Sequence, residues 1–318
     1  MSGDAYDPFT RGPFPVGVLI LQAHDAARDR LFPVEIRYPG RLSGPHPLVL
    51  YSHRSGGDRR SATFLTTHLA SHGYAVAALD HSEVVVPELG PNPGQTDEQR
   101  AARLEAIISS RVPDLRFLLD HLLNEPSPPV ELDADRIGLV GHSLGGWTVL
   151  ATAQADARVR TVVAHTPGGG ANPRPGVLNL PLSFESGRDV PTLFLAAELD
   201  VPIPPEAVED VHGRAPAPKR LVTLKRADHQ HFVDDVEGAH EAARAMPLPP
   251  AAAWMQAEMR PIVELCDGES AHRFVRGLTL SHLDATLRAD PGAVQLLDGD
   301  IEKELAARGI DAVAHAGR

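Results

Sequence analysis

Residues 136–146 read RIGLVGHSLGG, and the pattern of these residues is the strongest indication of the fold. The apolar run that opens it predicts a buried strand, and the pattern over 144–154 predicts a helix directly after it. Ser143 stands between the two in a glycine-x-serine-x-glycine motif, which is typical of a sharp, strained strand-to-helix turn. We expect side chains at Gly141 and Gly145 to collide with neighbouring backbone. Such a turn presents Ser143 Oγ above a helix N-terminus, so we predict a nucleophile here rather than a plain glycine turn.

Strand-like and helix-like segments alternate along the chain. This alternation predicts a doubly wound α/β fold, with a mostly parallel sheet of about eight strands and helices on both faces. The first two strands are expected to form a hairpin at one edge. The predicted strands cover 16–25, 31–39, 46–53, 74–81, 136–143, 159–167, 190–200 and 219–229. The predicted helices cover 61–73, 97–123 with an interruption near Pro113, 144–154 and 204–213.

The length of 318 residues allows one large domain or two small ones, and we predict a single domain over 1–318. Its core is expected over about 12–235, followed by a helical extension over about 238–318 that contains no clear strand. These last helices either pack on the sheet, or part of them covers the mouth of a pocket or forms a homodimer contact. Residues 83–96 read as a loop, and residues 167–189 are too short for a full cap domain and are expected to line the mouth of the site.

Composition narrows the class of partner. The formal net charge of −12 disfavours binding to nucleic acid. No apolar run is long enough to span a membrane, and the first residues do not have the pattern of a secretory signal. Cys266 is the only cysteine, which excludes an intrachain disulfide. We therefore expect a cytoplasmic protein whose partner is a small molecule.

A serine nucleophile requires a base and an acid, which follow it along the chain in the order acid, then histidine. Asp200 ends the predicted strand 190–200, and we expect it to be the acid. Glu198, two residues earlier, is the alternative acid, but because it lies nearer the strand its side chain can point the other way. His229 follows the last predicted strand, and we expect it to act as the base, with His231 packed nearby. The alternative for Asp200 is a helix-capping role.

Two further features of the sequence concern metals and the oxyanion hole. The two histidines of HQH at 229–231, with several aspartates nearby, could suggest metal ligands, but their spacing matches no known ligand motif, so we expect no metal and no organic cofactor. The backbone N–H of Leu144 is expected to donate to the oxyanion, with a second N–H from Ser55 or Arg54. Arg54, with the arginines at 59–60, either attracts an acidic substrate or forms a solvated loop.

The chain resembles the α/β-hydrolases, in the branch of the platelet-activating factor acetylhydrolases and dienelactone-hydrolase-related proteins, over about 12–235. The resemblance is carried by YSHRSGG, LASHGYAVAALDHSE, GHSLGGWTVL and ADHQHFVDD. It implies Ser143 as nucleophile, His229 as base, and Ser55 with Leu144 as oxyanion donors. Arg54 departs from the glycine frequent in that branch.

The position where the acetylhydrolases place their acid holds His165, which leaves Asp200, at the position used by most α/β-hydrolases, cutinase-like polyesterases included. Dienelactone hydrolases use a cysteine, whereas Cys266 lies far from the serine motif. The sequence thus predicts a serine hydrolase that cleaves carboxylic esters of small molecules through an acyl-enzyme. The alternatives are amide, thioester or other cleavage on the same fold, a metal-dependent hydrolase, or a non-catalytic binding protein.

Overall fold

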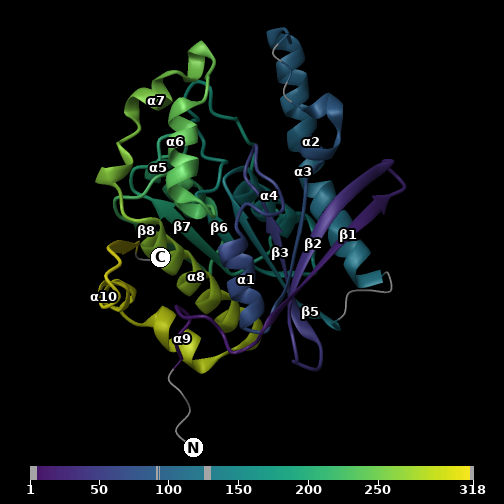
Figure 1. Cartoon of the computed structure of the whole chain (residues 1–318), viewed down its shortest axis with the longest axis vertical. Coiled ribbons are helices and arrows are strands. Elements are labelled where there is room, and N and C mark those ends of the chain that lie inside the picture. The colour runs from purple at the N-terminus through teal and green to yellow at the C-terminus, as the bar shows by residue number, and fades with distance from the viewer. Residues whose placement is uncertain (1–5, 91, 93, 125–129, 316–318) are drawn as a thin grey trace, which may run out of the picture.

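One sheet organises the computed structural model, which describes residues 6–90, 92, 94–124 and 130–315. Within these residues the sheet has nine strands in the order β1-β2-β4-β3-β5-β6-β7-β8-β9. The central strands from β4 to β8 are parallel, and the outer pairs are antiparallel (Figure 1). The strands are β1 Val16–Asp25, β2 Arg30–Pro39, β3 His46–Ser52, β4 Ala75–Leu79, β5 Leu132–His142, β6 Val159–His165, β7 Thr192–Ala197, β8 Lys219–Leu224 and β9 Ala312–His315.

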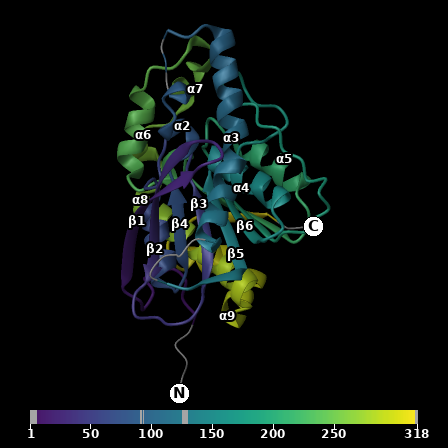
Figure 2. The ribbon, with the colours of Figure 1, turned by 90° about the vertical axis from the view of Figure 1, so that its right-hand side faces the viewer.

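Helices cover both faces of this sheet, which confirms the predicted doubly wound fold. One apolar core joins the sheet to α1, α8, α9 and α10, and a second joins the opposite face to α3, α4 and α5. Figure 2 shows α8 on one side of the strands and α3, α4 and α5 on the other. The α-helices are α1 Thr63–Ser71, α2 Ser82–Val85, α3 Asp97–Asn124, α4 Leu144–Ala155, α5 Pro205–Arg214, α6 Val236–Ala245, α7 Trp254–Glu258, α8 Gly268–Leu283, α9 Pro291–Asp298 and α10 Ile301–Ala306. Single turns lie at η1 Pro87–Leu89, η2 His229–Phe232, η3 Pro250–Ala252, η4 Ile262–Glu264 and η5 Asp284–Arg288.

The sequence predicted one edge of the sheet correctly and missed the strand at the other edge. β1 and β2 form the predicted edge hairpin, in register from Val16 opposite Pro39 to Asp25 opposite Arg30. The prediction that the C-terminal extension lacks a strand is wrong, because β9 pairs antiparallel with β8 and covers that edge. With four residues and two alanines, β9 is too short to show strand periodicity.

The predicted interruption of the long helix near Pro113 is also wrong, since α3 runs without a break from Asp97 to Asn124. Proline removes one backbone donor and normally bends or ends a helix. Here the buried polar side chains of Arg111 and Asp114, on either side of the proline, bond to neighbouring segments and hold the helix in place. The predicted loop over 83–96 likewise contains most of α2 and all of η1.

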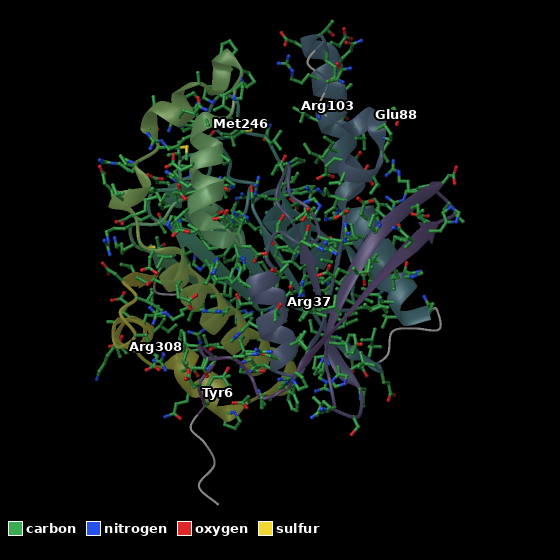
Figure 3. The ribbon with its side chains drawn as sticks, viewed as in Figure 1. Tyr6, Arg37, Glu88, Arg103, Met246 and Arg308 are labelled. Carbon is green, nitrogen blue, oxygen red and sulfur yellow. The ribbon has the colours of Figure 1, made fainter. Side chains whose placement is uncertain are left out.

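The extension packs mainly on the sheet. α8 lies on the same face as α1, and its Phe274 and Leu278 belong to the apolar core. The segment 248–255 before α8 instead lines a cavity with the N-terminal half of α3. Figure 3 labels Arg103 on α3 and Met246 just after α6, and both lie at the same end of the molecule.

Candidate active site

Ser143 lies in a sharp turn between β5 and α4. Its backbone has φ 60° and ψ −119°, a conformation that residues with a side chain rarely adopt. A Cβ at position 141 would lie 2.2 Å from the carbonyl oxygen of Gly145, and one at 145 would lie 2.0 Å from that of Ser52. Both positions therefore require glycine, as the sequence predicted. The turn places Ser143 at the carboxyl end of the central strands, directly before a helix N-terminus.

Backbone hydrogen bonds hold this turn from two directions. The Ser143 N–H donates to the carbonyl of His165 at 2.9 Å, and its own carbonyl accepts from Trp147 at 3.0 Å and from Gly168 at 3.2 Å. The strained residue is thus fixed by β6, by the loop that follows it and by the first turn of α4. A fixed backbone keeps the hydroxyl at one position for reaction.

His229 and Asp200 lie beside the turn and are bonded to each other. His229 Nδ1 donates to Asp200 Oδ2 at 2.7 Å, and the other oxygen of Asp200 accepts from the Ile203 N–H at 2.8 Å. Both side chains are almost fully buried. Burial raises the pKa of the Asp200 carboxyl, while its hydrogen bonds with His229 and Ile203 oppose this shift. Because a carboxylate only accepts, Nδ1 carries the proton and Nε2 is left to act as a base.

The position of His229 relative to Ser143 follows from two contacts. Its ring lies 4.7 Å from the ring of His142, the residue directly before Ser143, measured between centroids. Thr166 Oγ1 lies 3.3 Å from His229 Nδ1, and Gly168 of the same loop donates its N–H to the Ser143 carbonyl. The structure therefore brings the three predicted side chains to the same edge of the sheet, from the ends of β5, β7 and β8.

Glu198, the alternative acid, points elsewhere. Its carboxylate accepts from Lys225 Nζ at 2.7 Å and from the Arg226 N–H at 2.9 Å. The side chain is about one-third exposed, whereas that of Asp200 is fully buried. Two residues of turn after β7 are enough to send the two carboxylates to different neighbours. Only Asp200 contacts His229.

His231, the neighbour of His229, belongs to a separate buried cluster. Its Nδ1 lies 2.8 Å from Asp228 Oδ1 and its Nε2 lies 3.1 Å from the Cys266 carbonyl. Asp228 also contacts His240 of α6, with 2.5 Å between Oδ2 and Nδ1. Burial lowers the pKa of His231, but the bond to Asp228 outweighs it and raises the value to about 10. Within the described ranges, no group of three or more histidine, cysteine or acidic residues could hold a metal ion.

The predicted oxyanion donors lie on the two segments that meet at this turn. Leu144 is the first residue of α4, where backbone N–H groups have no partner in the helix. Ser55 lies in an exposed turn after β3, and Arg54 beside it is half-buried. Of the neighbouring arginines, Arg59 pairs with Asp80 at 2.5 Å, and Arg60 pairs with Glu35 at 2.6 Å. Because each of these arginines is paired with a carboxylate of the protein, we interpret the loop as structural rather than as a patch that attracts acidic substrates.

Sequence reasoning missed a buried polar network behind this loop. Arg111 and Asp114 of α3 bond to the segments that follow β3 and β4. The sequence holds one sign of this network. Arg111 and Asp114 are three residues apart, so both lie on the face of the helix that is otherwise apolar and buried.

A cavity of about 890 Å³ with mostly apolar walls lies against Trp147 of α4, one helical turn after Ser143. Ser143, Asp200 and His229 are not among the residues that line it, and the Trp147 indole N–H donates to the Pro181 carbonyl at 2.9 Å. Part of the predicted mouth segment, around 176–181, forms one wall. Among the described residues, no helix combines the length and the apolar character that a membrane span requires.

Comparison with known proteins supports the architecture and the chemistry. The family model described as chlorophyllase matches residues 5–178. A cutinase of Thermobifida alba, est1, is 26% identical over 248 residues, which cover 73% of this chain and 72% of that protein. Platelet-activating factor acetylhydrolase of Bos taurus is 24% identical over 235 residues, 61% of this chain and 49% of that protein. The chain thus spans about half the length of the acetylhydrolase.

A solved structure, the ferulic acid esterase from Streptomyces cinnamoneus, superposes with a TM-score of 0.68. The match covers 96% of this chain and 97% of that chain at 23% identity, and it shows the fold. The predicted resemblance to α/β-hydrolases is confirmed, and the named relatives agree with the prediction of a carboxylic ester hydrolase.

Proposed function

The chain belongs to the chlorophyllase family of α/β-hydrolases, and we propose that it hydrolyses carboxylic esters with Ser143, His229 and Asp200. The observation that carries the proposal is the buried bond from His229 to Asp200 beside the strained turn at Ser143. A histidine that a carboxylate orients, beside a half-buried serine at the carboxyl edge of the sheet, is the arrangement that nucleophilic acyl transfer requires.

The first half of the reaction forms an acyl-enzyme. Ser143 Oγ attacks the ester carbonyl carbon while His229 Nε2 accepts the hydroxyl proton. The resulting imidazolium is stabilised by the Asp200 carboxylate at 2.7 Å. Negative charge develops on the carbonyl oxygen, and the Leu144 N–H at the start of α4 donates to it. When the tetrahedral intermediate collapses, the alcohol leaves with the proton from His229.

The second half releases the acid. Water gives a proton to His229 Nε2 and attacks the acyl carbon, and the second tetrahedral intermediate uses the same N–H donors. Ser143 leaves as a hydroxyl after it takes the proton back. The bond to Asp200 fixes the proton on Nδ1 throughout, so Nε2 alone exchanges protons.

The apolar cavity next to Trp147 suggests which esters fit. Its volume of about 890 Å³ lies in the range of pockets that bury drug-sized ligands. Its walls come from α3, from Trp147 of α4, from the loop after β6 and from the segment after α6. The apolar residues among them are Ala101, Leu104, Ile108, Val112, Trp147, Val177, Leu178, Leu248, Ala251, Ala252 and Met255. We infer that the preferred esters carry a large apolar group on one side of the scissile bond.

The test is a series of p-nitrophenyl esters of rising acyl length, assayed on the wild type, on Ser143→Ala and on the exposed loop variant Ser183→Ala. We expect turnover that rises with acyl length, loss of turnover in Ser143→Ala, and wild-type rates in Ser183→Ala. Wild-type turnover in Ser143→Ala would contradict the proposal. Equal turnover of all acyl lengths would contradict the assignment of the cavity.

A further inference from the structure

Arg174 lies in the loop after β6 and forms an ion pair with a residue 84 positions later in the chain, and the proposed steps do not use it. Its Nη1 donates to Glu258 Oε2 of α7 at 2.6 Å, and its Nη2 donates to Glu258 Oε1 at 2.7 Å. Two parallel bonds of this kind fix the orientation of the two side chains as well as the distance between them. The ion pair therefore joins the two segments in one defined geometry, although both side chains are partly exposed.

The same guanidinium also stacks on Trp254. Its central carbon lies 3.4 Å from the centroid of the indole ring, and the indole N–H donates to the Pro175 carbonyl at 2.8 Å. A cation over the face of an indole is attracted by the electrons of the ring. Because the guanidinium is planar, its edge can bind Glu258 while its face lies on Trp254. Arg174 and Pro175 thus hold two side chains of α7.

The two segments are in direct contact beside this ion pair. A Cβ on Gly176 would lie 2.7 Å from the Cβ of Ala252, which is buried. Gly176 and several residues after it line the apolar cavity on one side, and the wall segment, residues 248–255, lines it on another. The position of the wall segment relative to the loop after β6 therefore sets the width of the cavity.

Few other bonds hold the wall segment in place. Gln256 Nε2 donates to the Ala243 carbonyl at 3.3 Å and to the Met246 carbonyl, which ties the segment back to the end of α6. Among the described residues, every other hydrogen bond that joins 247–259 to the rest of the chain involves Arg174 or Pro175. A segment with so few bonds to the body of the protein moves easily when one of them is removed.

We propose that Arg174 determines ester specificity, because it holds Trp254 and Glu258 and thereby fixes the wall segment against which a large apolar group of the ester packs. The inference rests on the proposed function, since it takes the cavity as the place where that group binds. Arg174 touches no reacting atom, so it is a positioning residue that acts on binding. Removing such an interaction raises KM for the esters that use the cavity and leaves kcat unchanged.

Arg174→Gln tests this role, because glutamine has neither the charge nor the fork of donors that binds Glu258. Glu258→Gln breaks the same ion pair from the other side. The matched control is Arg260→Gln, because Arg260 is an exposed arginine two residues after α7 that pairs with Glu264 of its own segment at 3.6 Å. All three residues are exposed enough for substitution without loss of the core.

Tryptophan fluorescence gives a readout that does not depend on turnover. The chain has two tryptophans, of which Trp147 lines the cavity and Trp254 belongs to the wall segment. Each variant would be made in a Ser143→Ala background, so that methyl octanoate binds without being hydrolysed, and its Kd would be measured by fluorescence titration. Kinetics with p-nitrophenyl octanoate and p-nitrophenyl acetate on the variants with Ser143 intact would supply kcat and KM.

We expect the Kd of methyl octanoate and the KM of p-nitrophenyl octanoate to rise about three- to tenfold in Arg174→Gln, with kcat and the KM of the acetate within about twofold of wild type. Glu258→Gln should give the same change, and the double variant should be no worse than either single variant, because both remove one interaction. Arg260→Gln should behave as the wild type.

Three results would overturn the inference alone when Ser143→Ala is inactive. These are a wild-type Kd in Arg174→Gln, an equal rise in Arg260→Gln, and the absence of a saturable fluorescence change with methyl octanoate. Wild-type turnover in Ser143→Ala would instead overturn the proposed function, and the inference with it.

Discussion

The carboxylate of Asp200 accepts a hydrogen bond of 2.7 Å from Nδ1 of His229, 29 residues later in the chain. The bond joins the turn after β7 to the turn after β8, and both side chains are buried. Glu198, two residues earlier, bonds to Lys225 instead. Asp200 therefore orients His229 whereas Glu198 binds Lys225, so substitutions of the two acids should differ in their effect on kcat.

Asp200→Asn is expected to lower kcat by about 10³- to 10⁴-fold, because an amide can hold the wrong tautomer of the histidine and cannot stabilise its cation. Glu198→Gln is the matched control, and its kcat should stay within about twofold of wild type, since it loses only a partly exposed ion pair. Steady-state kinetics on one p-nitrophenyl ester measures both. A larger loss in Glu198→Gln than in Asp200→Asn would reverse the assignment of the acid.

Gly145→Ala should abolish ester turnover or prevent folding, because the new Cβ would lie 2.0 Å from the backbone oxygen of Ser52. Gly213→Ala in α5 is the matched control, since a Cβ there meets nothing within 4 Å. Alanine favours a helix over glycine by about 1 kcal/mol, so Gly213→Ala should keep its activity with an equal or higher Tm. Thermal unfolding and an ester assay of both variants would show whether the close approach is real. Full activity in Gly145→Ala would refute it.

Filling the apolar cavity should change acyl selectivity. Ile108→Trp places a larger side chain on the cavity wall of α3, and we expect it to lower kcat/KM for long-chain esters about tenfold while short-chain esters react at the wild-type rate. Ala102→Trp lies on the exposed side of the same helix and serves as the control. Selectivity that changes equally in the two variants would show that the cavity does not hold the substrate.

The stability of the protein should depend on the protonation of His231. The bond to Asp228 raises the pKa of His231 from 6.5 in its ordinary state to about 10 in the fold. A group whose pKa is raised on folding stabilises the fold fully below its unfolded pKa, and this contribution is lost as the pH rises towards the folded value. We therefore expect the Tm difference between wild type and His231→Gln to be largest near pH 6 and to shrink by pH 10.

The matching control for this series is His24→Gln, since His24 is exposed and pairs with Asp29 at the surface. Its Tm should follow that of the wild type at every pH. If the difference between wild type and His231→Gln were constant or grew from pH 6 to pH 10, His231 would not be held as a cation in the fold.

Much of the site could be predicted because it depends on local patterns. The glycine at 141 is required by a steric conflict with Gly145, only four residues later, and such a local conflict leaves a motif, whereas the glycine at 145 is required by the backbone of Ser52, far away in the chain. Asp200 and His229 follow apolar strand patterns directly, so their position at the carboxyl edge of a parallel sheet follows from the topology. The choice between Asp200 and Glu198 needed coordinates, because the turn after β7 sets which carboxylate faces inward.

The errors have physical causes of a different kind. The continuous helix across Pro113 depends on tertiary bonds of Arg111 and Asp114, which outweigh the local preference of proline. β9 exists because β8 offers it an unpaired edge, which no pattern in its four residues reveals. The network of Arg111, His53 and His81 joins three segments far apart in the chain. The cytoplasmic location and a homodimer contact stay predictions.

Covalent labelling of the active site tests whether Ser143 is the activated nucleophile. The wild-type protein would be treated with a fluorophosphonate, which reacts with activated serines, and the modified peptide identified by mass spectrometry, with His229→Ala and heat-unfolded protein as controls. We predict one adduct per chain, on Ser143, formed much more slowly in His229→Ala and absent from the unfolded protein. An adduct on another serine, or Ser143 left unmodified in a folded protein that turns over esters, would contradict the account.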